Sequence, residues 1–310
     1  MNHRLILIDG ISGSGKTSIG QFLKRQYMLS GFSSRFLHEF HAPHPIHEWE
    51  ITDAEKWVTL TLNHWRKFTE EMVSSDDIVI MDATVFQGTC GVLLELDADR
   101  DVIFNFALPV PGIIEPLNPA LIYLYQADYR KALIKIYNER EERIKVKKEN
   151  YVRTIKYGQN RNLHGHEGYM QFVGELRDLS LNLFDQYEMS KIKIDNSDGD
   201  FIKLHKRILR FLDIPYKEDS FPRSDYIGLY RDMDSGRECR ISPGPEDGLE
   251  IQGFFPIIKS LCRQGGDIFQ IRGKAHELIF GRDNNNRVSD MISRWYIKES
   301  EDTVWKKVND

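Results

Sequence analysis

Cysteine is scarce in this chain, which has 310 residues and three cysteines, at Cys90, Cys239 and Cys262. Their odd number and their spacing argue against a disulfide framework and against a cysteine metal centre. We interpret them as reduced thiols, which indicates a cytoplasmic protein.

Long apolar runs and a strong excess of one charge are also missing. No segment approaches the ~20 apolar residues of a membrane span, and the N-terminus lacks the apolar core of a secretory signal. A formal net charge of −5 gives no reason to expect a nucleic acid polymer or a membrane as a partner. An apolar content of 41% is nevertheless enough for a sizeable core.

Glycine is concentrated near the N-terminus, in the stretch GISGSGKTS (10–18). It contains the pattern G-x-x-x-x-G-K-[ST], in which backbone N–H groups form an anion-binding nest before a helix N-terminus. The lysine of this pattern reaches the β- and γ-phosphates of a nucleotide, and the hydroxyl residue ligates Mg²⁺. The predicted phosphate-binding residues are Gly10, Ser12, Gly13, Ser14, Gly15, Lys16, Thr17 and Ser18. The alternative is a glycine turn without a ligand.

Residues 1 to about 214 alternate between strand-like and helix-like segments. This alternation predicts an α/β fold with a five-stranded parallel sheet and helices on both faces. The expected strands are 4–9, 33–40, 77–83, 119–126 and 190–197. The expected helices are 17–31, 52–73 with a capping box of Thr52 and Glu55, 128–150 capped by Asp128, 168–187 and 200–214.

The texture of the chain changes after residue 214. Residues 215–224 are polar and contain proline, which indicates a linker. Residues 225–310 consist of short alternating segments separated by Gly, Asn and Asp, which predicts a small all-β meander or barrel. We therefore expect a P-loop domain at 1–214, a linker at 215–224 and an all-β domain at 225–310.

Acidic residues end three of the predicted strands: Asp9, Glu39 and Asp82. Because ligands bind outside the carboxyl ends of parallel strands, we expect these residues to converge on the γ-phosphate. Asp82 and Thr17 are the candidate Mg²⁺ ligands, and Glu39 is the candidate for contacting the acceptor hydroxyl. Asp9 could instead brace the loop through backbone hydrogen bonds. Which of the three acts as base is open at this point.

Arg140 and Arg143 lie three residues apart in the charged segment NEREERIKVKK (138–148). Residues at this spacing share a helix face. Arginine forks suit phosphate, so the segment is a candidate lid that closes over the transferring group. A solvated helix face with Glu–Arg pairs is the alternative.

Histidines stand at positions 38, 41, 44 and 47. Pro43 and Pro45 prevent a helix that would align them, so we interpret this segment as an acceptor-binding loop rather than a structural metal site. Residues 160–172 form a second polar Gly/His loop that either closes over the acceptor or is a surface turn.

The segments GISGSGKT, IVIMDATVFQ and NPALIYLYQADYRKALIKIYNEREER resemble the P-loop kinases of the thymidylate-kinase and deoxynucleoside-kinase group. This resemblance covers residues 1–214. It implies ATP and Mg²⁺ as cofactors and a catalytic glutamate after the second strand, at Glu39. It also implies a carboxylate after the third strand, at Asp82, and an arginine lid at Arg140 and Arg143. Ala83 replaces the arginine of that group, which leaves its usual nucleoside or nucleotide acceptor open.

The resemblance also implies an adenine-binding loop near residues 195–200. The C-terminal segments YIGLYRD, DIFQIRG and HELIFGRDNNNRV resemble the small β domain behind some serine β-lactamase-like proteins. That resemblance implies a β-meander and no catalytic residue.

These features predict a cytoplasmic P-loop kinase that transfers the γ-phosphoryl group of Mg·ATP to a small-molecule acceptor, with Lys16, Glu39, Asp82, Arg140 and Arg143 as catalytic residues. One alternative is a nucleotide-binding ATPase or switch protein that acts on a partner. The chain lacks the N-K-x-D and L-S-G-G-Q signatures of the commonest switch classes. A non-catalytic nucleotide-binding protein is a third interpretation. The sequence leaves both monomer and homodimer open.

Overall fold

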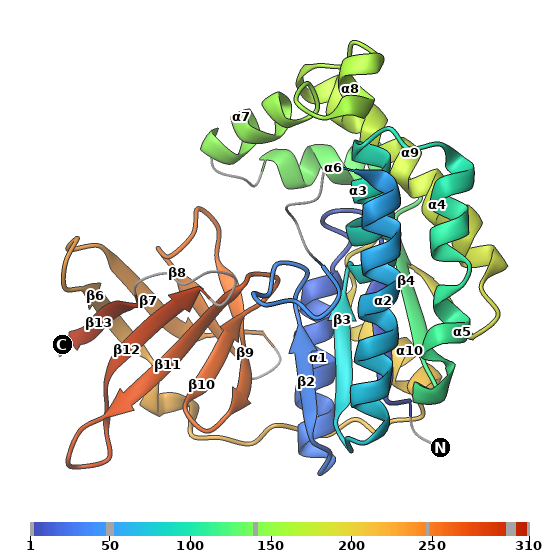
Figure 1. The fold of residues 1–310 in the computed structure, drawn as a ribbon. Helices are drawn as coiled ribbons and strands as arrows, with labels where there is room; N and C mark the ends of the chain where they lie inside the picture. Colours follow the sequence, from blue (N-terminus) through green and yellow to red (C-terminus); the bar gives the residue numbers. More distant parts are fainter. Residues whose placement is uncertain (1–2, 48–52, 139–141, 246–247, 296–301, 309–310) are drawn as a thin grey trace. The chain divides into compact units, whose positions relative to one another are not determined.

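The computed structural model describes residues 3–47, 53–138, 142–245, 248–295 and 302–308 (Figure 1). The chain forms two compact units. The first comprises Met1–Lys16, Phe32–Glu39 and Pro43–Tyr216. The second comprises Thr17–Gly31, Phe40–Ala42 and Lys217–Asp310. The helix that follows the glycine-rich loop therefore belongs, by its contacts, to the unit that contains the C-terminal strands.

The first unit is built on a five-stranded parallel sheet with the strand order β2-β3-β1-β4-β5. Its strands are β1 (Leu5–Asp9), β2 (Ser34–Leu37), β3 (Ile78–Asp82), β4 (Ala120–Tyr125) and β5 (Ser190–Asp195). The central strand β1 pairs with β3 and β4, and every residue of β1 and β3 is buried. Burial on both faces explains why these strands are continuous apolar runs.

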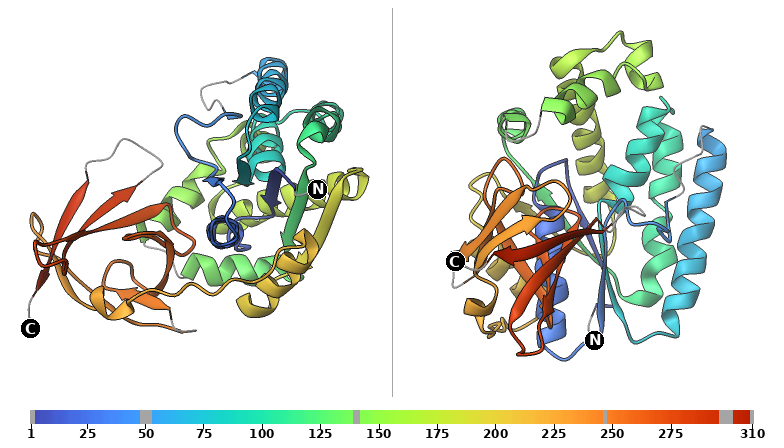
Figure 2. Two further views of the ribbon diagram at one scale, coloured as in Figure 1. Left: turned by 90° about the horizontal axis from the view of Figure 1, so that it is seen from below. Right: turned by 90° about the vertical axis from the view of Figure 1, so that its left-hand side faces the viewer.

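Helices cover both faces of this sheet. Side chains of α2 (Ala54–Val73), α4 (Arg100–Ala107), α5 (Val110–Ile114) and α9 (Gly165–Gln186) share one buried cluster with β1. The amphipathic helix α10 (Phe201–Leu212) lies on the other side of the sheet from α2 (Figure 2). The predicted α/β core is confirmed.

Shorter helical elements complete this unit. They are the π-helix η1 (Thr84–Cys90), α3 (Gly91–Glu95), η2 (Glu115–Leu117), α6 (Tyr129–Asn138), α7 (Glu142–Tyr151) and α8 (Lys156–Asn160). The helix predicted over 128–150 corresponds to α6 and α7, and residues 139–141 between them lie outside the described residues.

Two helix starts follow from side-chain caps. The Asp53 carboxylate accepts a hydrogen bond from the backbone N–H of Lys56 at 2.8 Å, so Asp53 is the N-cap of α2. The predicted cap Thr52 lies outside the described residues. Asp128 accepts from the N–H of Lys131 at 2.9 Å, which confirms the predicted cap of α6.

The second unit contains a closed barrel of eight antiparallel strands. Each strand pairs with the next one along the chain, and β6 pairs with β13 to close the barrel. The strands are β6 (Gly228–Asp232), β7 (Glu238–Pro243), β8 (Leu249–Gln252), β9 (Lys259–Gly265), β10 (Ile268–Ile271), β11 (His276–Arg282), β12 (Val288–Trp295) and β13 (Thr303–Val308). The predicted all-β meander or barrel is confirmed. In the described strands, closure leaves no unpaired edge of the barrel sheet.

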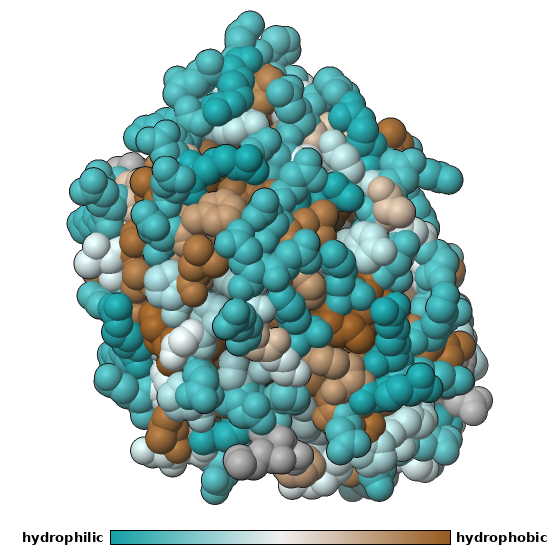
Figure 3. Space-filling model, turned by 90° about the vertical axis from the view of Figure 1, so that its right-hand side faces the viewer, coloured by the Kyte–Doolittle hydropathy of each residue, from teal (hydrophilic) through white to brown (hydrophobic). Residues whose placement is uncertain are grey.

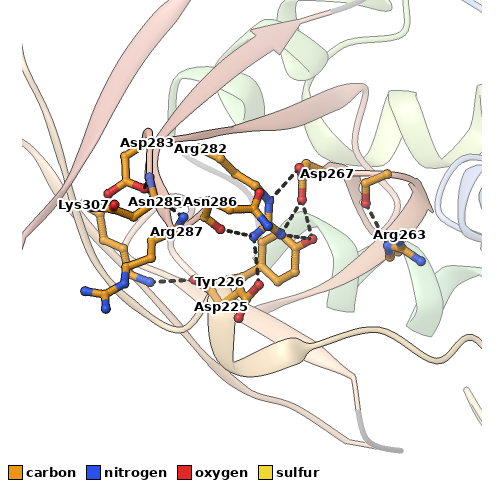
Figure 4. Close-up of polar contacts among 11 residues, drawn as sticks. Asp225, Tyr226, Arg263, Asp267, Arg282, Asp283, Asn285, Asn286, Arg287 and Lys307 are labelled. Carbon is orange, nitrogen blue, oxygen red and sulfur yellow. Dashed lines mark hydrogen bonds and ion pairs between the residues drawn. The ribbon is translucent and has the colours of Figure 1, made fainter.

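A polar network joins the barrel to the short helix η3 (Arg223–Asp225) that precedes it (Figure 4). Arg282 donates two hydrogen bonds to the Asp267 carboxylate, at 3.0 and 2.9 Å, and a third to Asp225 at 2.9 Å. The Tyr226 hydroxyl donates to Asp267 at 2.6 Å. These charges are paired with one another, and the Arg282 guanidinium lowers the pKa of Asp267.

Polar side chains of helix α1 (Lys16–Leu29) form hydrogen bonds within the second unit, to which its residues from Thr17 onward belong. The buried amide of Gln21 donates to the carbonyl of Lys274 at 3.0 Å, in the turn between β10 and β11. The amide of Gln26 exchanges two hydrogen bonds with the backbone of Lys217, at 3.0 and 2.8 Å. Glutamine side chains on one helix thus satisfy backbone groups of distant segments.

The surface is largely hydrophilic on the face shown in Figure 3, where apolar residues lie in patches separated by polar ones. Individual apolar side chains such as Val73 and Leu108 are exposed, which is normal for a protein surface. Among the residues that the structure describes, no helix combines the length and the apolar character needed to cross a membrane.

Candidate functional site

The glycine-rich loop follows the central strand β1 and leads into α1. Gly10 and Gly15 have φ angles of +140° and +103°, which side chains rarely adopt. A β-carbon at Gly10 would also lie 2.1 Å from the backbone oxygen of Leu124 in β4. The loop therefore turns tightly against the carboxyl end of the sheet, as the glycine spacing requires.

The segment after β5 braces this loop. The side-chain nitrogen of Asn196 donates to the Ser14 carbonyl at 2.7 Å, and the Asn196 backbone N–H donates to Tyr125 at 2.9 Å. The Ser14 hydroxyl is buried and has no hydrogen-bond partner among the described residues. A polar atom of this kind suits a loop whose ligand is polar.

Lys16 is the first residue of α1 and is 6% exposed. Its ammonium donates to the Ile11 carbonyl at 3.0 Å and to the side-chain oxygen of Gln87 at 2.7 Å. The positive charge is therefore held over the loop by two neutral oxygens.

Asp9 ends β1 and is almost completely buried. Its carboxylate accepts three backbone N–H groups, from Gly10 at 2.9 Å, Phe86 at 2.7 Å and Gln87 at 3.1 Å. Burial raises the pKa of Asp9, although the Lys16 charge and these hydrogen bonds act in the opposite direction. This geometry supports the interpretation of Asp9 as a brace that joins the loop to η1.

Glu39 and Asp82 follow β2 and end β3, two neighbouring strands. The Glu39 backbone N–H donates to Asp82 Oδ1 at 2.8 Å, and Glu39 Oε2 accepts from the side-chain nitrogen of Gln87 at 2.8 Å. Hydrogen bonds thus connect Lys16, Gln87, Glu39 and Asp82 in a continuous series. Three of these residues were predicted from the sequence, and Gln87 was not.

Gln87 is presented by the π-helix η1, which begins after an unusual residue. Ala83 is buried and has a φ of +53°, a left-handed conformation that costs a non-glycine residue about 1–2 kcal/mol. The π-helix is rare and frequently found at functional sites. Gln87 occurs inside the quoted stretch IVIMDATVFQ, but no spacing in that stretch pointed to it.

His47 of the predicted histidine loop contacts the backbone of Glu39. The two ring nitrogens of His47 lie 3.1 Å from the Thr84 carbonyl and 3.3 Å from the Glu39 carbonyl. The ring stacks on that of His44 at 4.3 Å, and burial lowers the pKa of His47. Within the part of the chain that the structure describes, no cluster of three or more His, Cys, Asp or Glu residues could hold a metal ion.

The predicted lid corresponds to α6 and α7. Arg140 lies outside the described residues. Arg143 belongs to α7, and its side chain lies outside the described part of the structure. The Tyr137 hydroxyl of α6 donates to Glu149 of α7, and its ring lies 4.3 Å from that of His166. The arginine roles remain predictions.

Other predicted phosphate-binding residues lie along the loop and the first turn of α1. A β-carbon at Gly13 would lie 1.9 Å from the side chain of Ile136 in α6. Thr17 and Ser18 follow Lys16 in α1, and the Ser18 hydroxyl lies against Gly273 in the second unit. Ser12 is partly exposed.

No known protein-family profile matches this chain, and no curated protein matches it in sequence. Among solved structures the chain is similar to a gluconokinase from Sinorhizobium meliloti 1021, with 14% sequence identity and a TM-score of 0.34. The match covers 69% of this chain and 94% of that chain. A likeness at this identity and TM-score says nothing about the function of this chain.

Proposed function

We propose that this protein is an ATP-dependent phosphotransferase that moves the γ-phosphoryl group of Mg·ATP to a small-molecule acceptor. The observation that carries the proposal is the series Lys16–Gln87–Glu39–Asp82, which starts at the glycine-rich loop at the end of the central strand. Phosphoryl transfer needs a phosphate cradle, a cation and a group that orients the acceptor. In this series Lys16 would supply the cation and Glu39 the group that orients the acceptor, and the glycine-rich loop next to them would form the phosphate cradle.

The glycine-rich loop supports nucleotide binding by its backbone conformation. Positive φ angles at Gly10, Gly13 and Gly15 are compatible with a nest of N–H groups before a helix N-terminus. The buried Ser14 hydroxyl adds a polar atom that lacks a partner among the described residues. Lys16 would exchange its two neutral acceptors for phosphate oxygens, with which a charged hydrogen bond is stronger.

Oxygen donors suited to Mg²⁺ are the hydroxyl of Thr17 and the carboxylate of Asp82. A bound Mg²⁺ would neutralise phosphate charge. Glu39 would orient or deprotonate the acceptor hydroxyl, and Gln87 would hold the Glu39 carboxylate in place. Arg140 and Arg143 would add charge from the lid.

The test is product analysis with Mg·ATP and a panel of nucleosides, nucleoside monophosphates and sugars. A phosphotransferase releases ADP and a phosphorylated product only when its acceptor is present. Steady ATP hydrolysis that no acceptor stimulates would replace the proposal with a nucleotide-dependent ATPase. Calorimetry with Mg·ATP tests the first step separately, and no binding at millimolar nucleotide would contradict both functions.

A further inference from the structure

Gln87 lies between the two oppositely charged side chains of the candidate site. Its amide oxygen accepts from Lys16 Nζ at 2.7 Å, and its amide nitrogen donates to Glu39 Oε2 at 2.8 Å. An ammonium only donates hydrogen bonds and a carboxylate only accepts them. An uncharged side chain that joins them needs one acceptor and one donor, and glutamine supplies both.

The backbone at Gln87 is anchored independently of this side chain. The N–H groups of Phe86 and Gln87 donate to the two oxygens of Asp9, at 2.7 and 3.1 Å. Asp9 also accepts from the N–H of Gly10 at the start of the phosphate loop. A substitution of the Gln87 side chain therefore keeps the backbone anchor, and its effect reports on the amide.

We propose that Gln87 is a positioning residue that couples occupation of the phosphate loop to the placement of Glu39. The inference rests on the proposed function. When the Lys16 ammonium turns to a nucleotide phosphate, the Gln87 oxygen loses its partner, and the hydrogen bond to Glu39 changes with it. Because coupling between two sites is reciprocal, Glu39 affects nucleotide affinity through Gln87.

The first test compares two substitutions of similar size by calorimetry with Mg·ATP. Gln87→Met removes the acceptor that competes for Lys16, so affinity should rise about five-fold, the equivalent of one net hydrogen bond. Gln87→Glu forms an ion pair with Lys16, so affinity should fall about ten-fold. A purely structural role would lower the affinity in both variants. Reduced affinity in Gln87→Met overturns the inference.

The second test asks whether Glu39 acts through Gln87. The effect of Glu39→Gln on Mg·ATP affinity is measured with Gln87 present and in the Gln87→Met background. Coupled residues should give effects that differ by at least about three-fold between the two backgrounds. Equal effects would show that Glu39 and Gln87 act independently, and the proposed coupling through Gln87 would be wrong.

Gln186 provides the matched control, because it is exposed on α9 and its side chain donates to Asn182 at 2.7 Å. Gln186→Met should leave Mg·ATP affinity unchanged, and thermal unfolding checks that each variant is folded. If the wild-type protein binds no Mg·ATP, both the proposed function and the proposed coupling through Gln87 are wrong. If the wild-type protein binds Mg·ATP and Lys16→Ala does not, the nucleotide site is supported, and the Gln87 variants alone test the coupling.

Discussion

The parallel sheet and the barrel distribute their polar groups in opposite ways. In the sheet, β1 and β3 are buried along their whole length, and their acidic side chains, Asp9 and Asp82, stand at the carboxyl ends. In the barrel strand β7 (Glu238–Pro243), by contrast, exposed charged residues alternate with buried apolar ones. One architecture concentrates polar side chains at a single edge, and the other spreads them over an outer surface.

The pairing of charges differs as well. In the second unit, Arg282 of β11 forms ion pairs with Asp225 and Asp267. At the sheet edge, Lys16 and Glu39 are joined through the neutral amide of Gln87. A charged side chain whose hydrogen-bond partner is neutral exchanges that partner for a ligand more easily than one that forms an ion pair. This contrast supports the proposal that the chemistry takes place at the carboxyl end of the sheet.

The largest effect is expected from the phosphate-loop lysine. Lys16→Ala should lower phosphoryl transfer by at least about 10²-fold, because it removes a preorganised cation from the transferring phosphate. Lys306→Ala in β13 should leave turnover unchanged, since its ammonium is exposed and pairs with the Asp290 carboxylate at 3.4 Å. Steady-state turnover with the identified acceptor measures both. Near-normal turnover in Lys16→Ala would contradict the proposal that the parallel sheet, and not the barrel, carries the active site.

Glu39→Gln should depress turnover by about 10²-fold and Mg·ATP affinity far less, because a neutral amide cannot deprotonate the acceptor. The barrel control is Glu238→Gln, which loses an exposed ion pair with Arg231 and should leave turnover unchanged. Turnover and calorimetry separate the two readouts. Unchanged turnover in Glu39→Gln would return that residue to the role of a surface carboxylate.

Glycine substitutions should separate the regions by stability. Gly10→Ala puts a β-carbon 2.1 Å from the fixed carbonyl of Leu124, at a φ of +140°, and should cost about 2–4 kcal/mol of unfolding free energy. Gly281→Ala in β11 meets the movable carboxylate of Asp290 at 2.3 Å and should cost about 1 kcal/mol or less. Urea unfolding measures both values. Equal costs would show that backbone rigidity at the loop is not the cause.

An acid dependence of stability is also expected, at the lower end of the effect of Gly10→Ala. Burial lowers the pKa of His276 in β11 from 6.5 to about 4, so the unfolded chain binds more protons between these values. Unfolding free energy should therefore decrease as the pH falls from 6.5 to 4, by about 2 kcal/mol after allowance for partial exposure. His276→Phe should reduce this decrease in urea titrations at pH 7 and pH 4.5.

His47 in the first unit has a pKa lowered by burial and contributes with the same sign. Any decrease in unfolding free energy at low pH that remains in His276→Phe therefore comes from groups other than His276, such as His47. An unchanged pH dependence in this variant would show that protonation of His276 is not linked to unfolding.

Local patterns predicted the sheet strands, the cap at Asp128 and the glycine turn, because each depends on neighbouring residues. They also placed Asp9, Glu39 and Asp82 at strand ends, where parallel pairing brings such residues to one edge. The sequence predicted no helix between Thr84 and Leu117, and this segment folds as short helices. The strand β9 (Lys259–Gly265) was likewise not expected, because its polar residues weaken the alternation.

The residues that the sequence did not reveal depend on contacts between distant segments. Gln87 is placed by Asp9, 78 positions away, and it meets Glu39, 48 positions away. No periodicity records such a pairing. The same holds for Gln21, whose amide is satisfied by a turn more than 250 positions later, at Lys274.

The position of α1 has a consequence for how this protein can be dissected. The helix starts at Lys16, the last residue of the first unit's N-terminal stretch, yet its side chains Gln21 and Gln26 complete the hydrogen bonding of the second unit. Chain order and three-dimensional grouping therefore disagree. Transplanting the barrel to another protein requires taking this helix along or supplying new partners for the backbone groups that it satisfies.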